Sequence, residues 1–505
     1  MSLEAYFSAY RNGIVGNDLT LPDGDTSIPV IYADWTASGR LYHPIEDYLL
    51  NELGPYVANT HTETTLTGST MTKAYHDAQH CIKDHVNADD NDVIICGGAG
   101  MTALINKFQR LLGVKIPEKW QDRFEISEDE KPLVLITHME HHSNQTTWSE
   151  CAVTLEMIPP DEKGLPDLNA MQAILTRYAS RAVKIGSFTA CSNVTGIKTP
   201  YYQMAEIMHK HEGLCFIDFA ASAPYVDINM HPANPLQKLD AIFISPHKFL
   251  GGPGSSGVMV FDKKLYTNKV PDQLGGGTVT WTNPWGEHRF FDNIEVREDG
   301  GTPAFLQTIK VALAIKVKES MGVDKMALRE KELTNIMMDG LKQHPSIHLL
   351  EDNQKERLCI VSLYVIGIHY NLIVRLLNDK FGIQTRGGCS CAGTYGHILL
   401  GVDEAMSHRI TDQINQGDVT QKPGWVRISL HPTSTDAQAH FIVDAVKQVV
   451  DNAEQWSENY NFSTFSGEFE KHQKTLYKSI DEFSPLGLSP EPNKTLFDRL
   501  KDGFS

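Results

Sequence analysis

The segment from Ser245 to Gly257 constrains the fold more than any other part of the 505-residue chain. It reads Ser-Pro-His-Lys-Phe-Leu-Gly-Gly-Pro-Gly-Ser-Ser-Gly and lies between two apolar runs, 240–244 and 258–261, that are typical of buried strands. Lys248 is thereby fixed at a strand end, beside glycines that let another molecule approach closely. Because lysine is rarely buried, a partly desolvated amine here suits a Schiff base to an aldehyde. Taken alone, the segment also fits a tight turn with a solvent-exposed lysine.

Composition excludes several classes of partner. The net charge of -18 argues against nucleic acid and anionic membranes, and no window approaches eighteen apolar residues. The N-terminus lacks the basic and apolar regions of a signal peptide, so we expect none. The eight cysteines lack the spacing of a disulfide framework, which fits a reducing cytoplasm. We therefore expect a cytoplasmic enzyme or binding protein that acts on small molecules.

Polar clusters follow five short apolar runs between residues 90 and 310. Each run is typical of a strand and alternates with helical patterns, which predicts an α/β fold with a mostly parallel sheet. Ligands of such sheets bind at the carboxyl ends of the strands. The runs, with the residues that follow them, are 92–96 before Gly97, 133–136 before Thr137, 184–188 before Cys191, 214–217 before Asp218, and 241–244 before Ser245.

The patterns divide the chain into four parts. We expect an N-terminal segment over 1–30, a large α/β domain over 31–310 and a smaller C-terminal α+β domain over 311–455. Residues 456–505 form an extension without an assigned role. Residues 115–131 are charged and predict a surface insertion within the large domain.

Two strand ends suggest how a phosphorylated aromatic ligand would be held. Gly97-Gly-Ala-Gly-Met-Thr102 joins a strand to a helix, and backbone N–H groups at a helix start suit a phosphate. The spacing fits neither the dinucleotide fingerprint nor the Walker lysine loop, so a plain turn is the alternative. Asp218 could keep a pyridinium nitrogen protonated, or it could simply cap a helix.

The run Thr137-His-Met-Glu-His-His-Ser-Asn144 contains metal-ligand types but lacks two histidines spaced i, i+4 on a helix. We therefore predict no metal, and prefer His141 as a flat ring stacked on an aromatic cofactor. Asn193, at the next strand end, could hydrogen-bond a ring hydroxyl.

Two arginines and a cysteine complete the candidate set. Arg427 lies in an apolar strand pattern, where it needs an anionic partner, and a substrate carboxylate is as suitable as a structural ion pair. Arg386 precedes a glycine-rich loop that contains Cys391. The thiol of Cys391 is either a nucleophile or a small buried apolar group.

Together these motifs resemble the class V aminotransferase family of fold-type I pyridoxal-phosphate (PLP) enzymes, and within it the cysteine desulfurase and selenocysteine lyase branch. The segments that carry the resemblance are Tyr32-Ala-Asp-Trp-Thr-Ala-Ser-Gly39, Glu140-His-His-Ser-Asn144, Ser192-Asn-Val194, Ser245-Pro-His-Lys248, Gly275-Gly-Gly-Thr278, Arg297-Glu-Asp-Gly-Gly-Thr-Pro303 and Arg386-Gly-Gly-Cys-Ser-Cys-Ala392.

The resemblance implies a role for each site residue. Lys248 would carry PLP, His141 would stack on the ring, and Asn193 and Asp218 would contact the ring hydroxyl and nitrogen. Arg427 and Arg386 would bind the substrate carboxylate. The phosphate would be held by Gly100, Met101, Thr102, Ser245 and His247, and by Thr278 of a neighbouring subunit in a homodimer.

The resemblance also implies a reaction, cleavage of L-cysteine to alanine with a persulfide on Cys391 that a sulfur-acceptor protein could receive. Two departures bear on it, because Ala221 replaces the family's glutamine and Cys389-Ser-Cys391 replaces His-His-Cys. Cys389 could then be the acceptor, or neither cysteine. The alternatives are a class V aminotransferase or another amino-acid lyase that needs no thiol, a non-catalytic scaffold with the same fold, and, more distantly, a metalloprotein.

Overall fold

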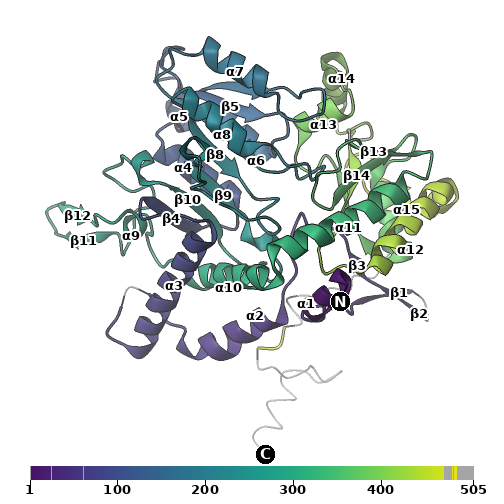
Figure 1. The fold of residues 1–505 in the computed structure, drawn as a ribbon, viewed down its shortest axis with the longest axis horizontal. Coiled ribbons are helices and arrows are strands. Elements are labelled where there is room, and N and C mark those ends of the chain that lie inside the picture. Colours follow the sequence, from purple (N-terminus) through teal and green to yellow (C-terminus); the bar gives the residue numbers. More distant parts are fainter. Residues whose placement is uncertain (1, 24–25, 61, 471–479, 481–482, 486–505) are drawn as a thin grey trace, which may run out of the picture.

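In the computed structural model, the described residues are 2–23, 26–60, 62–470, 480 and 483–485. The central element is a seven-stranded sheet with helices on both faces (Figure 1). In spatial order its strands are β4 (Asp92–Gly97), β10 (Gly257–Asp262), β9 (Ala241–Ile244), β8 (Leu214–Asp218), β7 (Lys184–Thr189), β5 (Leu133–Thr137) and β6 (Thr154–Ile158).

Five neighbouring strands, from β9 to β6, run parallel, which confirms the predicted α/β class. β10 is antiparallel to both β4 and β9. Side chains alternate between two separate cores: Ile94, Leu135 and Ile217 pack on one face, whereas Ile95 and Phe216 pack on the other. Because both faces are covered, the strands are continuous apolar runs.

Helices cover the large sheet and connect it to the second part of the chain. Those beside the sheet are α4 (Met101–Leu111), α6 (His142–Ser149), α7 (Leu168–Arg177) and α8 (Tyr201–Lys210). α3 (Leu66–His85) and α10 (Phe305–Met321) pack along each other. The expected insertion holds the short α5 (Glu118–Gln121), and residues 118–130 are exposed.

A four-stranded antiparallel sheet forms the second part. Its strands are β13 (Ile347–Leu349), β14 (Ile360–Val365), β17 (Trp425–Ser429) and β16 (Arg386–Gly388), and its main helices are α11 (Val323–Leu341), α12 (Tyr370–Phe381) and α15 (Asp436–Ser457). Thr435 and Gln438 form a reciprocal capping box that starts α15. The boundary expected at residue 310, between the large and the smaller domain, falls inside α10. The division of the chain into four parts stays a proposal.

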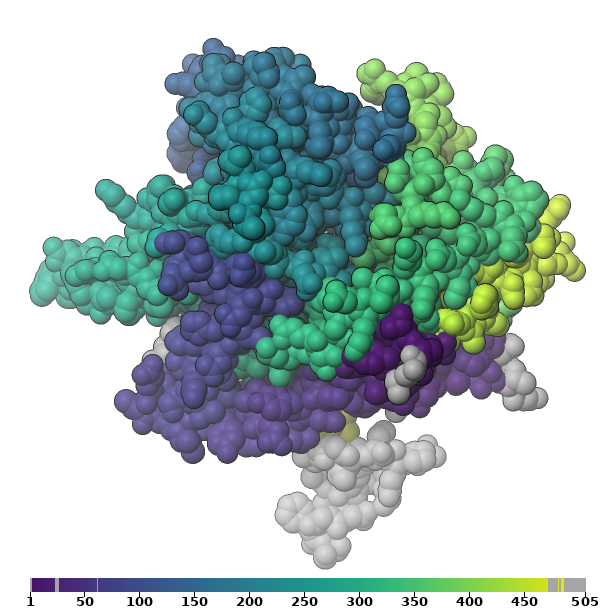
Figure 2. Space-filling model, in the orientation of Figure 1, coloured from purple at the N-terminus to yellow at the C-terminus, as the bar shows by residue number. Residues whose placement is uncertain are grey.

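The N-terminal residues join both parts. β3 (Ile31–Tyr32) pairs in parallel with β15 (Ile383–Gln384), more than 350 residues later in the chain. α1 (Leu3–Asn12) contacts α11, and Figure 2 shows this N-terminal region, in purple, along one side of the molecule. Residues 33–37 are thereby brought between the two sheets, where Asp34 forms a bridge with Ser429 of β17.

The extension after 456 is described only in part. A short hairpin, β18 (Asn461–Phe462) and β19 (Phe469–Glu470), lies against α12, and most later residues fall outside the described part of the chain. Within the described residues, none of the helices has the length and apolar character needed to cross a membrane.

Candidate active site

The ends of β4, β5, β7, β8 and β9 meet at one cavity of about 200 Å³ between the two sheets. Residues of the second part close its other side, including both predicted arginines. Eleven of the thirteen site residues expected from the sequence line this cavity: Met101, Thr102, His141, Asn193, Asp218, Ser245, His247, Lys248, Arg386, Cys391 and Arg427.

Lys248 lies at the end of a single 3-10 turn, Pro246–Lys248, that follows β9. Burial lowers the pKa of its amine from 10.5 to about 8, and the two nearby guanidinium groups act in the same direction. The carboxyl of Asp218 acts in the opposite direction. A substantial share of the amine is therefore neutral near pH 8, which is the form that attacks an aldehyde.

The start of α4 and the segment after β9 form a small cradle. The backbone N–H of Met101 donates to Ser245 Oγ (3.0 Å), and Thr102 Oγ1 lies 2.7 Å from Ser143 Oγ. A Cβ atom on Gly100 would stand 3.0 Å from the His247 ring and 3.1 Å from Ser245 Oγ, so only glycine leaves this space open. Gly100 thus shapes the cradle, although its own atoms do not line the cavity.

Asp218 and His141 stand on different strand ends of the cavity. Burial raises the pKa of the Asp218 carboxyl, which is 5% exposed and accepts the N–H of Ala220 (2.8 Å). A cation placed against this carboxylate would offset the cost of its burial. Burial lowers the pKa of His141 to about 4, with Lys248 as the next cause, so its ring is neutral at pH 7. Asn193 donates to the carbonyl of Ser390 (2.7 Å).

Glu140, to which the family resemblance assigned no role, lies at the centre of a buried hydrogen-bond network next to His141 in the chain. The carboxylate is 1% exposed and accepts hydrogen bonds from Thr137 Oγ1 (2.6 Å), the Thr189 N–H (3.0 Å) and Asn144 Nδ2 (2.8 Å). Burial nevertheless dominates and raises the pKa of Glu140 to about 7. Its network ties β5, β7 and α6 together. An acidic residue three positions after a buried strand was the available signal.

Asp34 is the second functional residue without a predicted role, although it lies inside a motif quoted above. Its Oδ1 is 2.7 Å from Arg427 Nη2, and its Oδ2 is 3.1 Å from Arg386 Nε. The two arginines face each other directly across β16 and β17. Arg427 is 2% exposed and also donates to the Asn193 carbonyl (3.0 Å). Asp34 therefore forms ion pairs with both guanidinium groups and does not itself line the cavity.

Cys391 lies at the exposed edge of the cavity, in a loop that α6 holds in place. Ser390 and Cys391 have φ of 53° and 56°, in the left-handed region that non-glycine residues rarely adopt. The His142 N–H donates to the Cys391 carbonyl (2.8 Å), and the Gly393 N–H donates to His142 Nε2 (2.9 Å). The second bond needs a neutral imidazole, and burial lowers the pKa of His142 accordingly. Cys389 is partly buried against a core cluster.

The three histidines of the 137–144 run have separate partners. His138 Nε2 lies 3.2 Å from the Gly164 carbonyl, His141 Nδ1 lies 3.1 Å from Ser143 Oγ, and His142 binds Gly393. Their ring nitrogens are therefore engaged in different directions. These hydrogen bonds account for the polar side chains of the run, which support the wall of the cavity.

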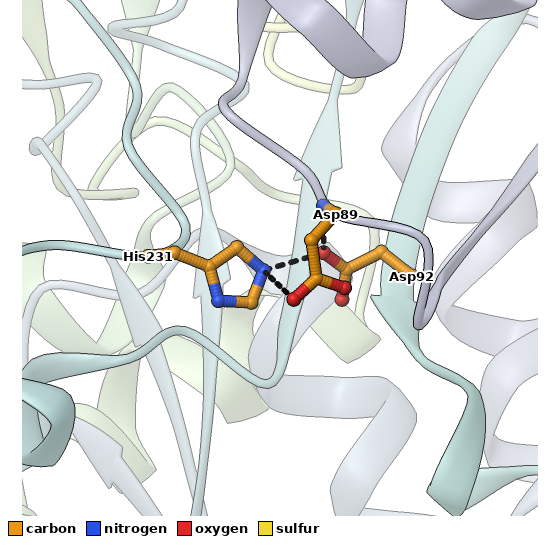
Figure 3. Close-up of side chains that lie close together, drawn as sticks. All are labelled: Asp89, Asp92 and His231. Atoms are coloured by element: carbon orange, nitrogen blue, oxygen red, sulfur yellow. Dashed lines mark hydrogen bonds and ion pairs between the residues drawn. The ribbon is translucent and has the colours of Figure 1, made fainter.

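Among the described residues, side chains with metal-ligand chemistry gather instead at Asp89, Asp92 and His231 (Figure 3). His231 Nε2 is 2.5 Å from Asp92 Oδ2 and 3.8 Å from Asp89 Oδ2. The Asp89 N–H also donates to Asp92 Oδ2 (2.8 Å). These bonds join the turn after α3 to the loop that carries His231, and none of the three residues lines the cavity.

Thr278 lies outside the cavity of its own chain. Its hydroxyl donates to the Gly275 carbonyl (2.7 Å), just before the hairpin β11 (Val279–Thr282) and β12 (His288–Phe290). This hairpin projects from the large part in Figure 1, and its Trp281 is 48% exposed. The expected contribution of Thr278 to a second subunit stays a prediction.

The sequence model of the class-V aminotransferase family matches residues 31–441, which include both sheets and the whole cavity. The chain belongs to this family. The family consists of PLP-dependent enzymes, so the expectation of a PLP-dependent enzyme is confirmed at this level.

Several similar proteins carry the name cysteine desulfurase. A probable cysteine desulfurase of Halalkalibacterium halodurans is 26% identical over 369 residues, covering 72% of this chain and 84% of that protein. One of Staphylococcus epidermidis is 27% identical over 367 residues, covering 72% and 83%. Among solved structures, a cysteine desulfurase of Thermococcus onnurineus superposes with a TM-score of 0.68 at 20% identity, covering 88% of this chain and 98% of that one. CsdA of Escherichia coli gives 0.67 at 19% identity, covering 89% and 98%. These structures confirm the fold-type I architecture.

The cavity residues fit PLP by their chemistry. Lys248 offers an amine with a lowered pKa, and Asp218 a buried carboxyl. The Gly100 cradle leaves open space that a side chain would fill, beside the start of an eleven-residue helix. Residues that line or shape this one cavity can thus bind PLP covalently and contact both its ring and its phosphate.

Proposed function

We propose that the chain is a PLP-dependent enzyme that cleaves the C–S bond of L-cysteine or a near relative and leaves alanine and a persulfide on Cys391. One observation carries the proposal: Lys248, Arg427 and Cys391 line the same cavity. An amine, a carboxylate site and a thiol are the groups that this reaction requires. The names of the similar proteins support the same reaction.

The protein's residues would hold the cofactor as follows. Lys248 would bind PLP through its amine, His141 would stack on the ring, and Asn193 and Asp218 would face the ring hydroxyl and nitrogen. The phosphate would lie in the cradle of Gly100, Met101, Thr102, Ser245 and His247. Once bound, PLP supplies an electron sink for the bonds that break at the amino acid.

Arg427, supported by Arg386, would bind the substrate carboxylate, and Lys248 would move the proton at Cα as base and then acid. The thiolate of Cys391 attacks the substrate sulfur, and the bond between that sulfur and Cβ breaks. Its electron pair stays with carbon, which takes up a proton and becomes the methyl group of alanine. The sulfur remains on Cys391 as a persulfide.

The test is alanine production from L-cysteine by the PLP-loaded protein, with Cys391→Ala and Cys389→Ala as a matched pair. We expect alanine from the wild type and from Cys389→Ala, and loss of alanine in Cys391→Ala. Loss in Cys389→Ala alone would move the nucleophile to Cys389. No alanine from the wild type, despite a Lys248-dependent absorbance of bound PLP, would refute the reaction.

A class V aminotransferase is the second candidate. The observation behind it is that Ala221, at the position where the family's pattern has a glutamine, lines the cavity together with Ala220. Such an enzyme needs a keto acid as amino acceptor and is indifferent to Cys391→Ala. A homodimer with Thr278 reaching the second site, a sulfur-acceptor protein and a cytoplasmic location stay predictions.

A further inference from the structure

Asp34 forms a charge triad with the two arginines of the cavity, of which Arg427 is buried and Arg386 is exposed. One carboxylate oxygen contacts Arg427 at 2.7 Å and the other contacts Arg386 at 3.1 Å. Asp34 is 9% exposed and does not line the cavity, whereas both arginines do. The acid therefore pairs with both guanidinium groups without lining the cavity that would hold a ligand.

One donor of the triad still lacks a partner. Arg427 Nε is buried without a hydrogen-bond acceptor, while its Nη1 and Nη2 contact the Asn193 carbonyl and Asp34. A buried guanidinium nitrogen without an acceptor is costly, and a ligand carboxylate would satisfy it. This position is thus prepared for one anionic group.

The charges of the triad set how many anionic groups fit. Two guanidinium groups and one carboxylate carry a net charge of +1, which a single ligand carboxylate cancels. The other charged groups at the cavity, Lys248 and Asp218, are the same in the wild type and in the variants of the triad, so their contribution cancels when these proteins are compared. A second acidic group on the ligand would leave a net negative charge beside the buried Arg427 and Asp34, where solvent screens charge repulsion less than at the exposed Arg386.

We propose that Asp34 is the specificity-determining residue of this site: by neutralising one of the two arginines it restricts the substrate to amino acids with a single carboxylate and rejects those with a second acidic group. This inference rests on the proposed binding of an amino-acid carboxylate by Arg427. It narrows the substrate class to neutral amino acids, a class that includes L-cysteine.

Succinamate and succinate provide a matched pair of probes, since they have the same length and differ by one charge. Their dissociation constants are measured by calorimetry on the full-length, PLP-loaded protein at fixed ionic strength. We expect the wild type to bind succinamate about tenfold more tightly than succinate, and Asp34→Asn to remove or reverse this preference. Asp34→Asn combined with Arg386→Gln restores the charge of +1, so the preference for succinamate should return.

An unchanged ratio of the two constants in Asp34→Asn, or a ratio that the double variant does not restore, would overturn the inference. If Asp34→Asn does not fold, Asp34→Ser, which removes the same charge and has a smaller side chain, takes its place and must remove or reverse the preference for succinamate. Neither probe contains sulfur or an amine. A failed desulfurase assay would therefore refute the reaction without touching this result, and a failed binding test would leave the reaction standing.

Discussion

Replacing Glu140 by glutamine should change how the stability of the protein depends on pH. The folded-state pKa of Glu140 is about 7, against an ordinary value of 4.5, because burial penalises the carboxylate. The folded protein therefore holds this proton more tightly than the unfolded chain. The resulting stability is fully present below pH 4.5 and is lost as the pH rises through 7. From these two values, the loss between pH 5 and pH 8.5 is about 2 to 3 kcal/mol.

Glutamine cannot titrate, so the free energy of unfolding of Glu140→Gln does not show this decrease with rising pH. Its Oε1 can still accept from Thr137 and Thr189, but its amide group faces the Asn144 amide, which costs about 1–3 kcal/mol. Asn144 cannot simply rotate, because its Oδ1 accepts from Ser187 Oγ (2.7 Å). Relative to the wild type, the variant should thus be least stable at pH 5 and gain about 2 to 3 kcal/mol by pH 8.5.

Urea unfolding followed by tryptophan fluorescence at pH 5, 6, 7 and 8.5 measures this difference, and titrations shared by both proteins cancel. Glu140→Ala is the control: it also cannot titrate, but it leaves the donors unpaired and should be destabilised by about 3–5 kcal/mol at pH 5. A difference between Glu140→Gln and wild type that stays constant across this range would refute the reasoning.

Three further predictions concern the cavity. Absorbance can be used to measure how fast the cofactor-free protein captures PLP. The rate should increase as the pH rises through about 8, because the Lys248 amine becomes neutral there. Lys248→Ala should abolish the absorbance signal. Gly100→Ala should weaken PLP binding about tenfold, since its Cβ atom would stand 3.0 Å from a histidine ring, whereas Gly97→Ala, with open space around it, should bind normally. Equal affinities would contradict the cradle. His142→Ala removes one hydrogen bond of about 1 kcal/mol from the Cys391 loop, the bond that the imidazole accepts from the Gly393 N–H, and keeps the backbone bond to the Cys391 carbonyl. The backbone amides of the loop should exchange hydrogen about fivefold faster, and unchanged exchange would show that other contacts hold the loop.

Local patterns were sufficient to predict the strand ends. The runs before Asp218 and Ser245 are buried strands in the structure, within one residue of their expected bounds. Their polar ends meet because parallel strands share one edge of the sheet. The direction of β10 was not predictable, because a short apolar run has the same composition in either orientation.

The triad at Asp34 shows why the remaining geometry could not be predicted. Asp34 lies 352 residues before Arg386 and 393 before Arg427, and it meets them only because β3 pairs with β15 and Asp34 bridges to β17. No periodicity within a short window records such a pairing. The sequence did identify Arg427 as a buried cation that needs a partner, but could not distinguish a substrate carboxylate from a structural ion pair. In the structure, Asp34 accepts from Nη2, and Nε is buried without a hydrogen-bond acceptor.

The carboxylate site and the thiol should respond together to changes in the second part of the chain. Arg386 and Arg427 face each other on β16 and β17, and Cys391 lies three residues beyond the end of β16. The residues proposed to contact PLP, by contrast, stand at strand ends of the large sheet. A small displacement of β16 would therefore move the substrate anchor and the nucleophile as one unit and leave the cofactor site in place. Substitutions that loosen β16 should alter KM for the substrate and alkylation of Cys391 in parallel, with the affinity for PLP unchanged; independent changes would show that the loop, and not the strand, positions the thiol.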